Sequence, residues 1–360
     1  MLRLQRAAGN RTVATLARAP TTAAAAPAGV AALTPTGARP VGDGISTAGA
    51  IDRYARKAIW FYQSHGDLDL ATYGRYLAAA VSTELAAVGC PGVQAIIGPG
   101  LMGALGEFEA DAWGIVINVD QLRGLEDATT IGDLDPGDAA LFASVVYHEG
   151  RHAEQRFRAM RLLAAEGEED PLQDLVPEIV AAARAMPLSR RAPARERAEA
   201  ASWRDYMFGE DETYVSAVDT WRKDVVTAAH LAHEVTSDNA TQTRERIARM
   251  LAGWVKEHGP GGYIRSHLAS AVARSRRALI SDVRRIDKAL AAAQAELDQL
   301  MPHPGKDDFP PLYAALVELA RALSAAYRDQ PTENDAFTAG NAAYDACLRW
   351  LKSRRRPLPG

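Results

Sequence analysis

Apolar residues recur at intervals of three and four along most of this chain, a spacing typical of amphipathic helices. This spacing predicts helices over residues 51–64, 70–88, 172–186, 194–208, 212–232, 263–301, 311–329 and 331–352. Turn-forming Gly and Pro residues end some of these segments, as in "GCPGV" after residue 88 and "HPGKDDFP" after residue 301.

One stretch, residues 112–120, alternates between large apolar residues and smaller or polar ones. The large residues are Trp113, Ile115, Ile117 and Val119. A period of two indicates a β-strand, and residues 93–98 suit a second short strand. A turn-rich connection over 123–138 leads into a further helix, which begins between Pro136 and Ala139. The expected fold class is therefore mainly α with a small β element.

That last helix carries the segment "SVVYHEGRHAEQRF", residues 144–157. Residues four apart lie on one face of a helix, about 6 Å apart at Cβ, so His148 and His152 are spaced to bind one Zn²⁺. Glu149 follows the first histidine and is placed to act as a general base on a water molecule that the metal activates. The motif H-E-x-x-H therefore predicts a catalytic zinc site.

The same segment has a simpler interpretation as a solvated helix face. In that case Glu149, Arg151 and Glu154 make surface ion pairs. Arg151 is also a candidate donor to an oxyanion, although a middle residue of the motif more often points away from the metal. Tyr327 is a second candidate donor, although core packing is its ordinary role. Another histidine pair, His230 and His233 in "HLAHE", fits an ordinary helix face better than a second metal site.

Two histidines do not complete a catalytic zinc site, which usually has three protein ligands and a water molecule. No third histidine follows within the next helical turns, so a more distant glutamate is expected to be the third ligand. The candidates are Glu196, Glu199, Glu210, Glu212 and Glu333.

Composition limits the possible classes of protein. The chain has 360 residues, 48% of them hydrophobic, which is enough for a sizeable core. A net charge of -4 gives no electrostatic argument for nucleic-acid binding. No apolar run approaches the roughly 18 to 20 residues that a membrane span requires. The two cysteines, Cys90 and Cys347, suit buried free thiols in a reducing cytoplasm, with a single disulfide as the alternative.

The first 42 residues contain five arginines and no acidic residue. Residues 19–40 are rich in Ala, Thr, Pro and Gly and are expected to form a disordered linker. We therefore expect a basic leader and linker over 1–45, a single domain over 46–350 and a basic tail over 351–360. The leader has no continuous apolar segment of the kind found in secretory signals. On composition alone, a transit peptide and a frayed basic tail both remain open.

"YHEGRHAEQRF", residues 147–157, resembles the "YHEARHAEQWF" helix of zincin-like proteins that accompany bacterial contractile injection systems. The resemblance extends to "WGIVINVDQL", to "EAASWRDYMFG" (with Tyr206 where a serine is usual) and to "YRDQPTENDAF". The leader "LQRAAGNRTVATLAR" is similar to a leader found on many proteins linked to these machines. The matches are short and run from the leader to about residue 340.

The resemblance implies a zincin-like fold and a zinc-dependent peptidase. Several related families supply the third ligand from an E-x-x-A motif on a late helix, which fits Glu333 to Ala336. Glu199 remains the alternative ligand, or a residue that supports a ligand histidine. Glu333 has a second interpretation as part of a helix start, with Thr332 as N-cap and Asp335 three residues later.

The resemblance also implies a cargo or toxin of a contractile injection apparatus. Such a protein is made in the bacterial cytoplasm, interacts with the apparatus through its leader and is delivered outside or into a target cell. Its expected substrate is a protein or peptide, and a strand upstream of the zinc helix is expected to pair with it as an edge strand. The alternatives are hydrolysis of a non-peptide amide and a non-catalytic structural or adaptor component with a zincin fold.

Overall fold

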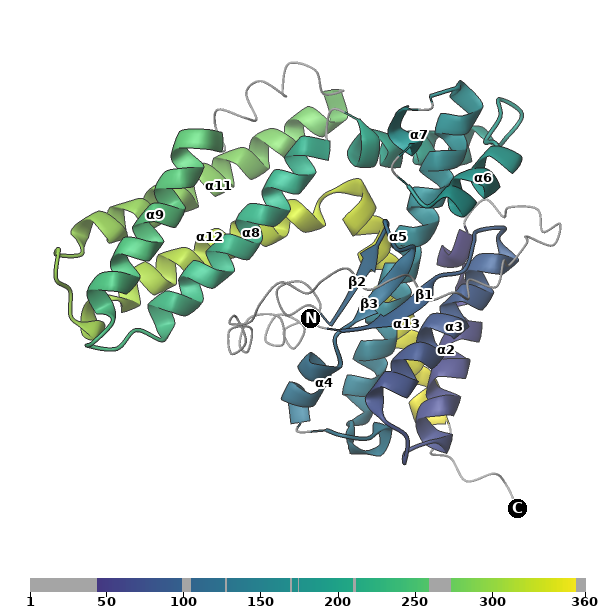
Figure 1. Ribbon diagram of the computed structural model, residues 1–360, viewed down its shortest axis with the longest axis horizontal. Helices are drawn as coiled ribbons and strands as arrows, with labels where there is room; N and C mark the ends of the chain where they lie inside the picture. Colours follow the sequence, from purple (N-terminus) through teal and green to yellow (C-terminus); the bar gives the residue numbers. More distant parts are fainter. Residues whose placement is uncertain are drawn as a thin grey trace. The chain divides into compact units, whose positions relative to one another are not determined.

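The computed structural model is mainly helical and carries one small sheet (Figure 1). It describes residues 44–98, 105–126, 128–168, 170–173, 175–209, 212–258 and 273–353. Contacts divide the chain into two compact units: unit 1 is Met1–Met207 with Asp335–Gly360, and unit 2 is Phe208–Asn334. The expected domain over 46–350 is thus distributed over both units.

The expected leader and tail fall largely outside the described residues, which begin at Gly44 and end at Ser353. Gly44 and Ile45, the last residues of the expected linker, are buried in unit 1. The backbone N–H of Ile45 donates to Glu154, and its carbonyl accepts from the hydroxyl of Tyr147. We call the 3₁₀ turn Gly44–Ser46 the N-terminal strap, because it packs against the helix of the histidine motif.

Unit 1 contains the described helices from the N-terminal part of the chain and most of the last helix. They are α2 (Ala48–Ser64), α3 (Leu70–Ala87), α4 (Val119–Glu126), α5 (Pro136–Glu166), α6 (Pro177–Ala185), α7 (Ala194–Phe208) and most of α13 (Pro331–Ser353). Short 3₁₀ turns at Ile131–Asp133 and Asp170–Leu172 join some of them. The helices expected over 51–64, 70–88, 194–208 and 331–352 are confirmed.

The sheet of unit 1 has the strand order β1-β3-β2, from β1 (Gln94–Ile97), β2 (Gly106–Glu109) and β3 (Gly114–Ile117). β3 pairs in parallel with β1 and antiparallel with β2. The strand expected over 112–120 is thus β3, but it is shorter and lies in the centre of the sheet. It ends early because the side chain of Asn118 accepts from the N–H of Gln121 and caps α4.

The expectation that this strand forms an edge is therefore wrong. β1 and β2 are the two edges of the described sheet, since each pairs only with β3, and the sequence pattern did not reveal β2. β2 lies against α5, and Gly106 makes the approach possible. A Cβ at Gly106 would lie 2.9 Å from the side chain of Val145.

α5 is the central helix of unit 1 and begins and ends at clear signals. The side chain of Asp135 accepts from the N–H of Asp138, Pro136 occupies the first turn, and Gly167 ends the helix in the left-handed region at φ 76°. A helix containing residues 144–157 is thus confirmed. α3 packs closely on it, since a Cβ at Gly150 would lie 2.4 Å from Val81.

The described residues of unit 2 form four long helices with an apolar core. They are α8 (Glu212–His233), α9 (Ala240–His258), α11 (Ala273–Gln299) and α12 (Pro310–Arg328). α9 was not expected, and the helix expected over 263–301 is described from Ala273 onward. The core contains Ile247, Leu290 and a row of leucines along α12.

Both cysteines belong to unit 1, are buried and carry free thiols, as expected. Burial raises the pKa of Cys347 to about 12 and raises the pKa of Cys90 well above its ordinary value. Both thiols therefore stay protonated near neutral pH. Separately, no helix among the described residues combines the length and apolar character needed to cross a membrane.

Candidate metal centre

His148 and His152 lie side by side on one face of α5. Their Nε2 atoms are 3.0 Å apart, and their ring centroids are 4.7 Å apart. The ring of Phe337 on α13 packs against His148 with a centroid separation of 4.5 Å. A Cβ at Gly340 would lie 3.1 Å from the Cβ of His148, so this glycine lets α13 approach α5 closely.

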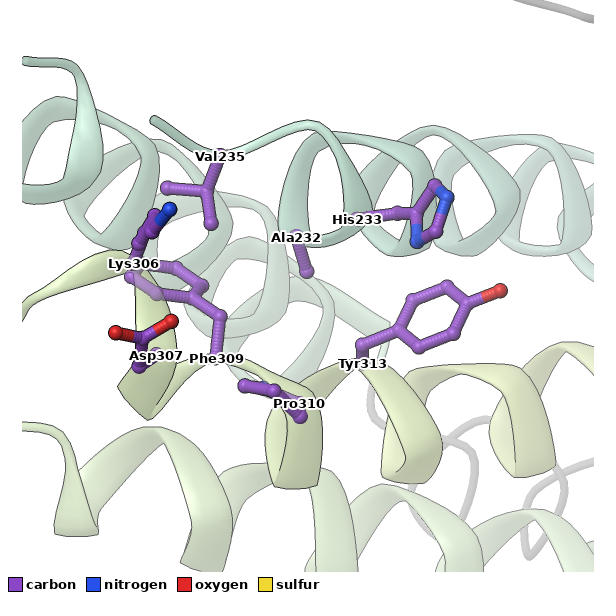
Figure 2. A pocket seen from close by; sticks show the side chains of 8 residues that line it. All are labelled: Ala232, His233, Val235, Lys306, Asp307, Phe309, Pro310 and Tyr313. Carbon is purple, nitrogen blue, oxygen red and sulfur yellow. The ribbon is translucent and has the colours of Figure 1, made fainter. Parts of the chain in front are cut away.

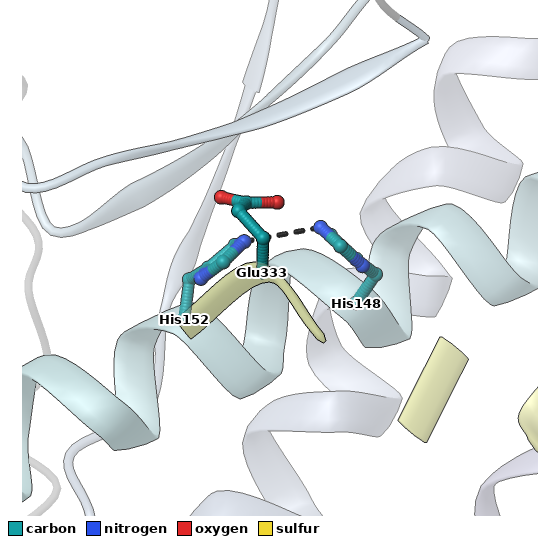
Figure 3. Close-up of side chains that lie close together, drawn as sticks. All are labelled: His148, His152 and Glu333. Atoms are coloured by element: carbon teal, nitrogen blue, oxygen red, sulfur yellow. Dashed lines mark hydrogen bonds between the residues drawn. The ribbon is translucent and has the colours of Figure 1, made fainter. Parts of the chain in front are cut away.

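Glu333 joins the two histidines from the first turn of α13 (Figure 3). One ligand atom from each of His148, His152 and Glu333 lies within 4.8 Å of the others. The boundary between the two units falls within this turn, and the rest of α13, from Asp335 onward, belongs to unit 1. Within the described residues, these three form the one group of at least three His, Cys, Asp or Glu residues that can hold a metal ion.

The donor set and its spacing fit a zinc ion. Zinc binds imidazole nitrogen at about 2.0–2.1 Å and carboxylate oxygen at about 2.0–2.2 Å, so neighbouring ligand atoms lie roughly 3.3 Å apart. The 3.0 Å between the Nε2 atoms is close to that value, and the 4.8 Å limit requires only a small movement of side chains. Three protein ligands of this type leave one position for water, as in catalytic zinc sites.

Glu149 is buried beside this group and faces the edge strand. Its Oε2 atom accepts a 2.9 Å hydrogen bond from the N–H of Phe108 on β2. Its Oε1 atom lies 3.9 Å from Nε2 of His148. The carboxylate is therefore held next to the ligand nitrogen by backbone from the sheet, without being one of the three grouped ligands.

The side of α5 next to the histidines is buried and charged, so the interpretation as a solvated face is wrong. Arg151 and Glu154 have relative exposures of 2% and 1%. Arg151 bonds to both Glu154 and Asp335, and Arg158 lies 2.6 Å from Glu154. Although burial lowers it, the pKa of Arg151 is raised overall by Glu154 and Asp335. The guanidinium groups of Arg151 and Arg158 also lie 5.1 and 5.9 Å from the ring centre of Trp203.

This charged network extends to His152 through Gln155. Nδ1 of His152 lies 2.9 Å from Oε1 of Gln155, and Nε2 of Gln155 donates to Asp335 over 2.7 Å. Asp335 is also the acceptor for Nε of Arg151, over 2.7 Å. The sequence motif did not point to Gln155. Asp335, which contacts Gln155, lies 180 positions further along the chain.

The other glutamates considered as third ligands lie elsewhere or outside the described part. Glu196 pairs with Arg161 at 3.5 Å. Glu199 pairs with Arg195 at 2.9 Å and lies 3.8 Å from Arg158, so it contacts the charged network rather than a histidine. Residue 210 is not described, and for residue 212 only the backbone is described.

The interpretation of residues 332–335 as a capping box is also wrong. α13 begins at Pro331, so Thr332 lies within the first turn rather than before it. Asp335 accepts hydrogen bonds from Arg151 and Gln155. Within unit 2, Tyr327 is hydrogen-bonded to Glu333. The pKa of Tyr327 is raised well above its ordinary value, mainly by burial and secondly by the charge of Glu333.

The histidines of "HLAHE" lie in unit 2 and form no described metal group. Nε2 of His230 lies 2.7 Å from Glu234, and His233 packs on Tyr313 with centroids 5.0 Å apart. His233 and Tyr313 line a cavity of about 280 Å³ beside Lys306 and Phe309 (Figure 2). These contacts agree with an ordinary helix face.

Comparisons of the chain with protein-family models, with curated proteins and with solved structures found no significant match.

Proposed function

We propose that this protein is a zinc-dependent peptidase with a zincin-like fold. The observation that carries the proposal is the convergence of His148, His152 and Glu333 within 4.8 Å, with Glu149 buried beside them. A structural metal site needs only ligands, whereas this site adds a carboxylate next to a ligand nitrogen. A carboxylate in that position suits a general base.

The residues of the chain have separate roles in the proposed reaction. When bound, a zinc ion supplies Lewis acidity, which makes a water molecule nucleophilic near neutral pH and polarises a substrate carbonyl. Glu149 accepts the proton of the attacking water and later donates it to the leaving amine. The hydrogen bond from Phe108 holds the carboxylate in place during both steps. His148, His152 and Glu333 hold the metal.

β2 supports a peptide as the substrate. It carries the residue that bonds to Glu149, and only β3 pairs with it among the described strands. An extended peptide that adds to such an edge makes main-chain hydrogen bonds and places its carbonyl groups along the strand. A non-peptide amide would gain nothing from this edge.

The resemblance of the motif helix and leader supports a role as cargo or toxin of a bacterial contractile injection system. On this proposal, the leader is the segment that the apparatus binds. A comparison of secretion with and without residues 1–43, in a cell that makes such an apparatus, tests this part separately from catalysis.

Zinc content and substitution of Glu149 test the peptidase proposal. Purified protein should contain about one zinc per chain. Glu149→Gln should keep that zinc and lose about 10²- to 10⁴-fold in turnover. Turnover is counted as new peptide amino termini, by mass spectrometry, after incubation with a denatured protein mixture. Glu166→Gln, on the same helix about 26 Å further along, is the matched control.

The same substitution at Glu333 tests the third ligand. Glu333→Gln should weaken zinc affinity by at least 10- to 100-fold, and excess zinc should partly restore its activity. Excess zinc should not restore Glu149→Gln. If Glu199→Gln lost zinc while Glu333→Gln retained it, the ligand would be Glu199. If the parent bound zinc but released no new amino termini, the non-catalytic alternative would be favoured. If Glu149→Gln cleaved like the parent, Glu149 would not be the general base.

A further inference from the structure

The hydrogen bonds that join His152 to the charged network alternate strictly between donors and acceptors. Glu154 and Asp335 are carboxylates and accept only, and Arg151 donates to both. Gln155 is the one member that can both donate and accept. Its orientation therefore decides which kind of group it presents to His152.

Asp335 determines the orientation of the Gln155 amide. Because a carboxylate accepts only, the amide nitrogen of Gln155 must face Asp335, which it does at 2.7 Å. The amide oxygen then faces Nδ1 of His152, at 2.9 Å. An oxygen accepts only, so Nδ1 must carry the proton.

A proton on Nδ1 leaves Nε2 of a neutral imidazole with its lone pair. Nε2 is the atom of His152 that faces His148. The other tautomer would place a hydrogen where the metal binds. We infer that Gln155 and Asp335 are positioning residues that select the metal-binding tautomer of His152. This inference deepens the proposed zinc site and rests on it for its functional meaning.

Asp335 is itself held by Arg151, which makes two contacts to its carboxylate at 2.7 and 3.3 Å. Arg151 is 2% exposed and bonds to Glu154, which in turn accepts from the N–H of Ile45. The network thus begins at the N-terminal strap and ends at a metal ligand. All of its members lie in unit 1.

Substitutions at Gln155 distinguish the effect of losing its hydrogen-bond acceptor from the effect of changing its side-chain volume. Gln155→Met keeps an unbranched chain but removes the acceptor, and Gln155→Glu keeps an acceptor oxygen. ¹⁵N shifts of the histidine side chains, measured on the metal-free full-length chain, report the tautomer of His152. Zinc affinity is measured by competition with a chromophoric chelator.

We expect the parent to hold the proton on Nδ1. Gln155→Glu should also keep it there, but should bind zinc less tightly than the parent, because its carboxylate replaces the N–H that faces Asp335 and repels that carboxylate. Gln155→Met should give a mixture of tautomers and lose about 10- to 100-fold in zinc affinity. Asp335→Asn should shift the tautomer in the same direction and lose about tenfold, because an asparagine can present either a donor or an acceptor to Gln155.

Glu196→Gln is the matched control, since Glu196 is also a carboxylate paired with an arginine of α5. It should leave both the tautomer and zinc affinity unchanged. The inference is wrong if Gln155→Met keeps the Nδ1 proton and parental affinity, or if Glu196→Gln weakens zinc binding as much as Asp335→Asn. If the parent takes up no zinc, the proposed function fails, and the nitrogen shifts alone decide the tautomer.

Discussion

α5 of unit 1 and α12 of unit 2 differ in the kind of side chain that they bury. On α12 the buried side chains are apolar and follow the helical period, as at Leu312, Leu316, Leu319 and Leu323. On α5 the buried side chains include Arg151, Glu154 and Arg158 along with the motif residues.

This difference shows what the two helices require from their surroundings. An apolar row is stabilised by any well-packed apolar neighbour, and it tolerates swaps of similar volume. A buried charge must have a specific partner, because desolvation is costly unless the charge is paired. α5 thus depends on particular residues of α7 and α13, whereas α12 depends on shape and volume.

The largest expected effect concerns the proposed metal ligands of α5. The double variant His148→Ala, His152→Ala should retain almost none of the roughly one zinc per chain expected in the parent, because both nitrogen ligands are lost. Metal analysis of purified protein measures this. The double variant His230→Ala, His233→Ala removes two histidines from unit 2 and should keep full zinc. Equal zinc in both double variants would contradict the assignment.

The next effect tests the cost of an unpaired buried charge. Arg151→Met should lower the free energy of unfolding by about 3–5 kcal/mol, because Glu154 and Asp335 lose their shared partner. Urea unfolding monitored by circular dichroism gives the value. A loss below 1 kcal/mol would show that the network on α5 is not the constraint that its burial suggests.

A substitution on α12 provides the contrasting case. Leu316 is completely buried in the core of unit 2, so Leu316→Ala should destabilise by about 2–5 kcal/mol through the cavity it leaves. The same unfolding experiment measures it, and zinc affinity in the folded protein should not change. A loss of zinc affinity comparable to that of Asp335→Asn would remove the distinction between the two helices.

The smallest effects concern the N-terminal strap. A chain that begins at residue 44 should unfold at nearly the parental temperature, because the segment removed has the composition of a linker. A chain that begins at residue 47 should lose about 1.5–3 kcal/mol, since it lacks the fully buried Ile45. Equal midpoints for the two truncated chains would show that the strap contributes nothing to stability.

Much of the helical content could be predicted from the sequence, because apolar period and capping residues are local signals. The start of α5 follows from Asp135 and Pro136, and its motif histidines from their spacing. β2 was missed because a four-residue strand, "GEFE", contains too few positions to show an alternation. α4 was missed because Asn118 was taken as part of a strand rather than as a helix cap.

Contacts between distant segments could not be derived from local patterns. Glu333 was singled out through a resemblance, and only the fold brings it beside His148 and His152. The pairing of Gln155 with Asp335 spans 180 positions and left no periodic signal. The burial of Arg151 was likewise unexpected, because a charged residue in a helix usually faces solvent.

The glycines around α5 have a consequence for mutational tolerance. Gly106 of β2, Gly150 of α5 and Gly340 of α13 each occupy a position where even a methyl group would meet a neighbouring atom, at 2.9, 2.4 and 3.1 Å respectively. In a saturation scan scored by function, alanine at these positions should therefore be about as damaging as loss of a chemical group. A map of intolerant positions would then mark a shell of glycines that perform no chemistry, and a search for catalytic residues by tolerance alone would mistake them for part of the reaction.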